Sequence, residues 1–386
     1  MEMSTVEKHY FALLRAALWD TPVSIAEEID WKGVMGMARH QANNILVYNK
    51  ASQMTGSNKP SPELMEKMKN EMRGHFFHLM QLKQMLGVVL KKLRENNIEP
   101  VVLKGFGLAL LYPNPDLRQM GDVDLFFRPD DFHQSCELMR SIPNMYHWCM
   151  EWETGNHYNL DYNVGSLKFI LEMHCITADL LDHKDKAFYA AIECEGLYEA
   201  PQHVVLDGTT ISIPSKEFMV FFAFYHAWHH FLTSGVGWRQ ISDVAMTLHA
   251  YNGQLDLDKL RQWFTDMHIM KPWQAFGFLM VEHLGLSQGE MPFYDASCRR
   301  TAQKLYATIM KVGNFRRNSK FKRRQPKNKF VHKIHTFMGV FVDFFYRARV
   351  FPQVAFREMK ISLKNGFLKQ SKKIMKKSDF FNRALN

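Results

Sequence analysis

The sequence predicts an α+β protein, in which a small mixed β-sheet domain is flanked by N-terminal and C-terminal helical regions. Apolar residues recur at helical spacing before residue 98 and again after residue 214. Between these positions, short apolar runs alternate with turns rich in Gly, Pro and Asn, which is typical of strands. The chain has 386 residues, 46% of them hydrophobic, so it can bury a substantial core. An aromatic content of 13% excludes a wholly disordered chain.

Four segments follow from this pattern. We expect an N-terminal helical region over 1–97, a sheet domain over 98–214, a helical domain over 215–310, and a basic tail with an aromatic helical segment over 311–386. The longest N-terminal helix should begin at Pro60 and Ser61, because a Ser–Pro-rich start is typical of a capped helix. The helices expected outside the sheet domain cover 5–19, 30–52, 61–97, 215–232, 239–250, 257–267 and 272–284.

The sheet domain should begin with a strand at 100–103. The glycine-containing turn 104–107 interrupts it, and a short helix over 108–112 ends before Pro113. Pro129 should open a helix that runs to about Arg140. The remaining strands are expected at 122–127, 158–163 and 167–175, with a hairpin at 204–206 and 210–213.

The charge is concentrated at the C-terminal end. Residues 311–386 hold 21 lysines and arginines but only three acidic residues, whereas the whole chain has a net charge of +10. Such a tail can bind a polyanion, either nucleic acid or an anionic membrane surface. The alternatives are a solvated tail or a helical extension folded back on the mildly acidic body. Within the tail, 314–329 is expected to be a loose linker and 331–356 an interfacial or packed helix.

Neither a signal peptide nor a transmembrane helix is expected. Charged residues interrupt the first twenty positions, and no run of about 18 apolar residues occurs. The five cysteines form no CxxC pair, which indicates scattered reduced thiols. We therefore expect a cytoplasmic protein, with peripheral membrane association left open through the tail.

The most informative residues are Asp122 and Asp124. Side chains on a strand alternate between faces, so both carboxylates should point to one side while Val123 and Leu125 point to a core. Two adjacent carboxylates repel each other unless a cation neutralises them. Mg²⁺ prefers such oxygen ligands and keeps positions open for substrate phosphates. An exposed strand face without catalytic function is the alternative.

Four further positions suit phosphate binding. Lys104 and Gly105 lie between a strand and a helix, where backbone N–H groups and an ammonium can meet an anion. Arg118, in a loop broken by prolines, could reach a phosphate or clamp a carboxylate. Gly121 would let the backbone approach a bulky phosphate closely.

Glu172 and His174 share one face of a later strand. A carboxylate in the apolar run 167–175 is costly to bury without a partner, and a metal shared with Asp122 and Asp124 would provide one. His174 could orient a substrate or bind a phosphate; a structural histidine is the alternative.

The ordered combination of these motifs resembles a poorly characterised bacterial group of nucleotidyltransferases in the polymerase-beta-like superfamily. Its pattern of LKG, YP, R, GDxDL and a later [DE]xH is matched by Leu103-Lys104-Gly105, Tyr112-Pro113, Arg118, Gly121-Asp122-Val123-Asp124-Leu125 and Glu172-Met173-His174. A weaker similarity extends to His226, His229 and 239–243. The sequence departs from the wider superfamily at Gly105-Phe106, where Gly-Ser is usual, so phosphate binding would rely on the backbone and Lys104.

The resemblance implies a magnesium-dependent reaction (or a manganese-dependent one). Asp122 and Asp124 would hold Mg²⁺ on ATP or another nucleoside triphosphate. Glu172 would help to bind a second metal ion and activate an acceptor hydroxyl for in-line attack on the α-phosphate, with release of pyrophosphate. The acceptor is not identified. Lys104, Gly105, Arg118, Gly121 and His174 are the expected nucleotide-binding residues.

Other interpretations remain open. His226 and His230 have the i,i+4 spacing of a zinc helix, but the Glu of an HExxH motif is missing, which favours packing or substrate contact. Arg239 and Asp243 could form a helical ion pair. A metal-dependent glycosyltransferase that uses Asp122 and Asp124, and a non-catalytic protein that binds polyanions or membranes through its tail, are the alternative functions.

Overall fold

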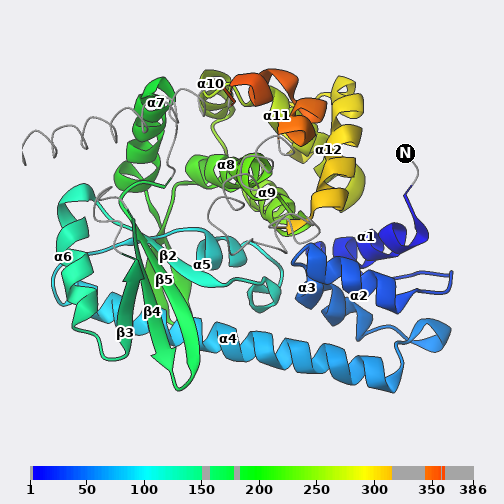
Figure 1. Ribbon diagram of the computed structural model, residues 1–386, viewed down its shortest axis with the longest axis horizontal. Coiled ribbons are helices and arrows are strands. Elements are labelled where there is room, and N and C mark those ends of the chain that lie inside the picture. Colours follow the sequence, from blue (N-terminus) through cyan, green and yellow to red (C-terminus); the bar gives the residue numbers. More distant parts are fainter. Residues whose placement is uncertain (1–2, 150–156, 178–182, 315–343, 358, 361–386) are drawn as a thin grey trace, which may run out of the picture.

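The computed structural model describes residues 3–149, 157–177, 183–314, 344–357 and 359–360, and it confirms the α+β class. A seven-stranded mixed sheet lies between an N-terminal and a C-terminal group of helices. In Figure 1 the long helix α4 runs along the bottom, from the N-terminal helices to the sheet, and α8 to α12 lie above.

The N-terminal helices follow the local sequence signals. The capping box of α1 (Thr5–Leu18) pairs the Ser4 hydroxyl with the Glu7 backbone and the Glu7 carboxylate with the Ser4 backbone. At α4 (Pro62–Arg94) the hydroxyl of Ser61 accepts a hydrogen bond from the backbone N–H of Leu64, as the Pro60-Ser61 start predicts. The single helix expected over 30–52 is instead two, α2 (Trp31–His40) and α3 (Asn44–Ala51), with a turn between them in which Ala42 takes a φ of 58°. A 3₁₀ turn, η1 (Gly56–Asn58), follows.

The sheet has the strand order β3-β4-β5-β2-β1-β7-β6. Strand β2 pairs in parallel with β5 and antiparallel with β1, and β4 pairs antiparallel with both β3 and β5. Strand β3 and helix α7 were not expected from the sequence. The strands are β1 (Val101–Val102), β2 (Asp122–Phe126), β3 (Met145–Cys149), β4 (His157–Val164), β5 (Leu167–His174), β6 (Gln202–Leu206) and β7 (Thr209–Ile213).

The two faces of the sheet differ in polarity. Val123 and Leu125 of β2, with Leu171 of β5, are buried on one face. Helix α4 covers this face, since the ring of His78 lies 5.2 Å from the ring of Phe169, and α6 (Pro129–Arg140) packs beside α4. The opposite face carries the polar side chains of the same strands, as the two-residue period requires.

The short helix after β1 begins earlier than expected. Helix α5 spans Lys104–Ala109, so the prediction of a turn over 104–107 and a helix over 108–112 was wrong. Both glycines lie within this helix. A Cβ atom on Gly107 would lie 3.3 Å from the side chain of Met219 and 3.4 Å from that of Ile213. The absence of a side chain at Gly107 therefore lets α5 pack closely against β7 and α8.

The C-terminal helices form an aromatic core. Phe264 and Trp273 stack at 4.4 Å, and Phe224 packs edge-to-face on both, at 5.8 and 5.1 Å. These contacts join α8, α10 and α11. The elements outside the sheet and after α5 are η2 (Pro115–Leu117), α7 (His183–Cys194), η3 (Glu195–Glu199), α8 (Lys216–Thr233), α9 (Trp238–Ala250), α10 (Leu257–Asp266), α11 (Met270–Leu279), η4 (Met280–Leu284), η5 (Gln288–Glu290), η6 (Ala296–Cys298) and α12 (Arg299–Val312).

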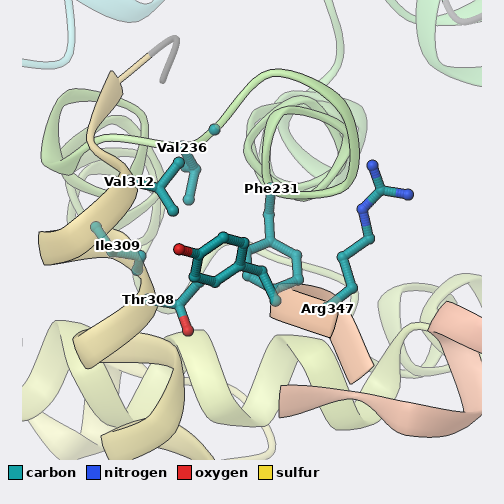
Figure 2. Close-up of a pocket in the computed structure, with 8 residues that line it drawn as sticks. Phe231, Val236, Thr308, Ile309, Val312 and Arg347 are labelled. Carbon is teal, nitrogen blue, oxygen red and sulfur yellow. The ribbon is translucent and has the colours of Figure 1, made fainter. Parts of the chain in front are cut away.

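The described part of the tail is helical and packs on the body. Within it, 344–350 and 352–357 are helical, and the Phe351 ring lies 5.2 Å from Trp228 and 5.8 Å from Phe231 on α8. Figure 2 shows the seam between this segment, α8 and α12, where a small pocket is lined by residues that include Phe231, Thr308, Ile309 and Arg347. Its cavity of about 30 Å³ has room for about one or two water molecules, so it is a packing defect rather than a ligand site.

Apart from Asn314, the linker expected over 314–329 lies outside the described residues, and so does most of the remaining basic tail, including 361–386. In the described part of the chain, no helix has both the length and the hydrophobicity needed to cross a bilayer.

Candidate active site

Strands β2 and β5 bring the three acidic residues onto one face. The parallel register sets Asp124 opposite Glu172 and Asp122 opposite Ile170. Asp124 is only 1% exposed, whereas Asp122 and Glu172 are half-buried. Three carboxylates therefore lie together on the polar face of the sheet, at the positions the sequence singled out.

Lys104, at the start of α5, reaches back over the sheet. Its Nζ lies 2.8 Å from Oδ1 of Asp124. Without substrate, the lysine therefore neutralises a carboxylate. Whether it also binds a phosphate stays a prediction.

His174 joins two of the carboxylates. Its Nε2 lies 3.2 Å from Oδ1 of Asp124 and 3.5 Å from Oε2 of Glu172. The ring of His157, from β4, stacks on the His174 ring with centroids 4.5 Å apart. His157 was missed from the sequence. The signal that could have found it is the antiparallel pairing of β4 with β5, which sets His157 opposite His174.

The pKa values of the three carboxylates are shifted in different directions. Burial and the neighbouring Asp124 carboxylate raise the pKa of Asp122 to about 6. Burial opposes ionisation of Asp124 as well, but Lys104 and His174 outweigh it and lower its pKa. For Glu172, the effect of burial is likewise outweighed by His157 and His174, which lower its pKa. Asp122 is thus the least compensated negative charge in the site.

Arg118 is held by a buried carboxylate of the helical domain. Its Nε and Nη2 donate to the two oxygens of Asp243 on α9, at 2.6 and 2.9 Å, and its Nη1 donates to the carbonyl of Gly105 at 3.0 Å. The hydroxyl of Tyr112 donates to the same carboxylate at 2.7 Å. The proposed Arg239–Asp243 helical ion pair was therefore wrong. Arg239 instead donates to the carbonyl of Gln119 at 3.0 Å.

The two expected glycine positions have different environments. The carbonyl of Gly105 accepts the bond from Arg118, and a Cβ there would lie 3.5 Å from the carbonyl oxygen of Asp122. A Cβ at Gly121 would meet nothing within 4 Å, so packing does not demand glycine there.

Helix α8 places a histidine pair close to the site. The Nε2 atoms of His226 and His230 lie 3.0 Å apart. Burial lowers the pKa of His226, and the cations of Lys104 and Arg239 lower it further. Both effects keep this imidazole neutral.

A sequence model of a family described as uncharacterised nucleotidyltransferase matches residues 27–285. Among solved structures, the chain is similar to one described as the crystal structure of an antigenic nucleotidyltransferase-like protein from Paracoccidioides brasiliensis. The identity is 14% and the TM-score 0.35, over 56% of this chain and 94% of that chain. No curated protein sequence matches. Because the family match spans more than half of the chain and includes all three carboxylates, the chain belongs to the uncharacterised nucleotidyltransferase family.

Proposed function

We propose that this protein transfers a nucleoside monophosphate from a nucleoside triphosphate to a hydroxyl acceptor and releases pyrophosphate. The observation that carries the proposal is the placement of Asp122, Asp124 and Glu172 on one face of adjacent strands in a nucleotidyltransferase family member. Assignment to the polymerase-beta-like superfamily, and its metal-dependent chemistry, are part of this proposal.

The donor set fits a hard divalent cation. Carboxylate oxygens are the ligands Mg²⁺ prefers, and the raised pKa of Asp122 marks negative charge that the protein's own cations do not compensate. Asp122, Asp124 and Glu172 would hold the ion. When bound, Mg²⁺ (or Mn²⁺) would neutralise charge on the triphosphate oxygens.

The chain's own residues would then position the reactants. Lys104 would contact the triphosphate, because its ammonium lies beside Asp124. Glu172 would accept a hydrogen bond from the acceptor hydroxyl and orient it, and the proton would pass to solvent as the hydroxyl oxygen attacks the α-phosphorus. The bond from that phosphorus to the bridging oxygen breaks, and pyrophosphate leaves. Arg118, fixed by Asp243, would hold the loop before β2 in place.

Ligand-dependent thermal stability tests this function first. Each of the four ribonucleoside triphosphates is added with and without Mg²⁺ to the wild type, to the Asp122→Asn/Asp124→Asn variant, and to Glu66→Gln as an exposed carboxylate control. At ten times its dissociation constant, a bound triphosphate adds about 1.4 kcal/mol to the free energy of unfolding. We expect a Mg²⁺-dependent shift in the wild type and in Glu66→Gln that the double variant lacks.

Transfer is tested next with the triphosphate that produced the shift. The label is placed on the α-phosphate and followed into acceptors that carry a free hydroxyl group. If no triphosphate stabilises the wild type at millimolar concentration with either Mg²⁺ or Mn²⁺, the proposal is wrong.

A further inference from the structure

We propose that His157, Glu172 and His174 form a binding site for a divalent transition metal such as Zn²⁺ or Co²⁺. This centre shares Glu172 with the carboxylate site for a hard cation and adds two imidazole nitrogens as donors. It lies where β4 and β5 pair, on the same polar face of the sheet.

The strand register creates the site. His157 lies directly opposite His174 in the antiparallel pair, and Glu172 is two residues before His174, so all three side chains share one face. One donor atom from each residue lies within 4.8 Å of the other two. Oε2 of Glu172 is 3.5 Å from Nε2 of His174 and 3.8 Å from Nε2 of His157. Ligands at about 2.1 Å from a tetrahedral ion lie roughly 3.4 Å apart, so small side-chain rotations would complete the coordination.

The Nε2 atom of His157 is buried and makes no hydrogen bond among the described residues. Oε2 of Glu172 lies 3.8 Å from it, which is too far for a hydrogen bond. The side-chain carbonyl of Asn159, which lies opposite Glu172, also makes no hydrogen bond there. A buried polar atom without a hydrogen bond costs stability, and a metal ion would use the imidazole lone pair. The His157 side chain as a whole is 33% exposed, so this part of the sheet lies near the surface.

The donor chemistry sets the metal preference. Two imidazole nitrogens and one carboxylate oxygen suit zinc, cobalt and their neighbours, whereas Mg²⁺ prefers oxygen ligands alone. The histidine pair on α8 is a weaker competitor. His226 and His230 offer two nitrogens 3.0 Å apart, but among the described residues no third His, Cys, Asp or Glu donor completes a group with them.

The test uses full-length protein freed of metal with a chelator and then titrated with Co²⁺. Nitrogen and oxygen ligands in a four-coordinate site produce visible absorption bands that free aqueous Co²⁺ lacks. We expect saturable binding of one ion, loss of the bands on addition of Zn²⁺, and no loss with excess Mg²⁺. His157→Gln should weaken binding by at least about tenfold. His40→Gln, at an exposed histidine on α2, and His226→Gln should bind like the wild type.

A second measurement needs no variant. Zn²⁺ should protect His157 of the wild type from acylation by diethyl pyrocarbonate, read by mass spectrometry, while His40 stays reactive. The inference is overturned if His157→Gln binds Co²⁺ as tightly as the wild type, if only His226→Gln loses the bands, or if Zn²⁺ leaves His157 reactive. Displacement of Co²⁺ by Mg²⁺ at equal concentration would equally overturn it.

The outcome is separable from that of the proposed function, although both use Glu172. The titration contains no nucleotide and leaves Asp122 and Asp124 intact. A protein that binds a triphosphate with Mg²⁺ but shows no cobalt bands would refute the transition-metal site alone. Cobalt bands without triphosphate binding would refute the nucleotidyl transfer alone.

Discussion

Replacing Arg118 with methionine should strongly destabilise the protein. Arg118 and Asp243 are each 4% exposed, and the guanidinium donates two hydrogen bonds to that carboxylate and one to the Gly105 carbonyl. Methionine has similar length but cannot donate. The variant would leave the carboxylate of Asp243 buried, with the Tyr112 hydroxyl as its one remaining side-chain donor among the described residues.

The expected cost follows from the desolvated charge. Removing one partner of a buried ion pair costs about 3–5 kcal/mol, because the other charge stays uncompensated. Tyr112 still donates to Asp243, so we expect the lower part of this range, about 3 kcal/mol. A solvent-exposed ion pair should cost much less to break. Arg73 and Glu66 are 67% and 56% exposed, and Arg73→Met should cost no more than about 1 kcal/mol.

Urea unfolding of four proteins measures the coupling. These are the wild type, Arg118→Met, Asp243→Asn and the double variant, with Arg73→Met as the surface control. The double variant should be less destabilised than the sum of the single variants by more than about 1 kcal/mol, since it carries no unpaired buried charge. Additive effects, or equal losses in Arg118→Met and Arg73→Met, would refute the reasoning.

Three other substitutions have defined outcomes. The folded pKa of Asp122, about 6, exceeds the ordinary value of 3.8, so the metal-free wild type should gain stability as the pH falls from 7 to 5. Asp122→Asn should remove this dependence and stabilise the metal-free protein at pH 7.5 by up to about 3 kcal/mol in urea unfolding. Gly196→Ala would place a Cβ 2.3 Å from Cβ of Phe218, and should lower the free energy of unfolding by about 1–3 kcal/mol, whereas Gly74→Ala in α4, with open space, should not lower it. Phe351→Ala removes the ring that packs on α8, so limited proteolysis should cleave the variant within 344–357 faster than the wild type.

Helix starts and strand faces were predictable from the sequence because residues close together in the chain determine them. Pro129 opens α6 where the sequence placed it, and the alternation around Asp122 and Asp124 set which face of β2 is polar. The start of α5 was misjudged because glycine normally weakens a helix. Here close packing of Gly107 against Met219 favours it, and that contact joins distant segments.

The long-range parts of the site were beyond local rules. Arg118 and Asp243 are 125 residues apart, and the sequence offered Arg239 as a nearer partner for the aspartate. His157 could be placed in the site only from the register of β4 on β5, which sets it opposite His174. The sequence thus singled out the carboxylates together with Lys104 and His174, while the partner of Arg118 and the position of His157 depended on tertiary packing.

Two buried ion pairs of this chain should respond differently to ligand binding. The Arg118–Asp243 pair is closed, because Tyr112 and the Gly105 carbonyl satisfy the remaining donors and acceptors around it. The pair of Lys104 with Asp124 is open, in the sense that uncompensated negative charge remains beside it. Lys104 compensates a single charge, while the neighbouring Asp122 keeps a raised pKa because the surplus of negative charge is not cancelled. A closed pair fixes α9 to the loop before β2 and gains nothing from a ligand. An open pair lowers its energy when a cation arrives, and the same cation would release the ammonium of Lys104 for an anionic substrate. Binding of the cation and of the triphosphate should therefore each favour the other, as a positive coupling free energy between neighbouring sites requires.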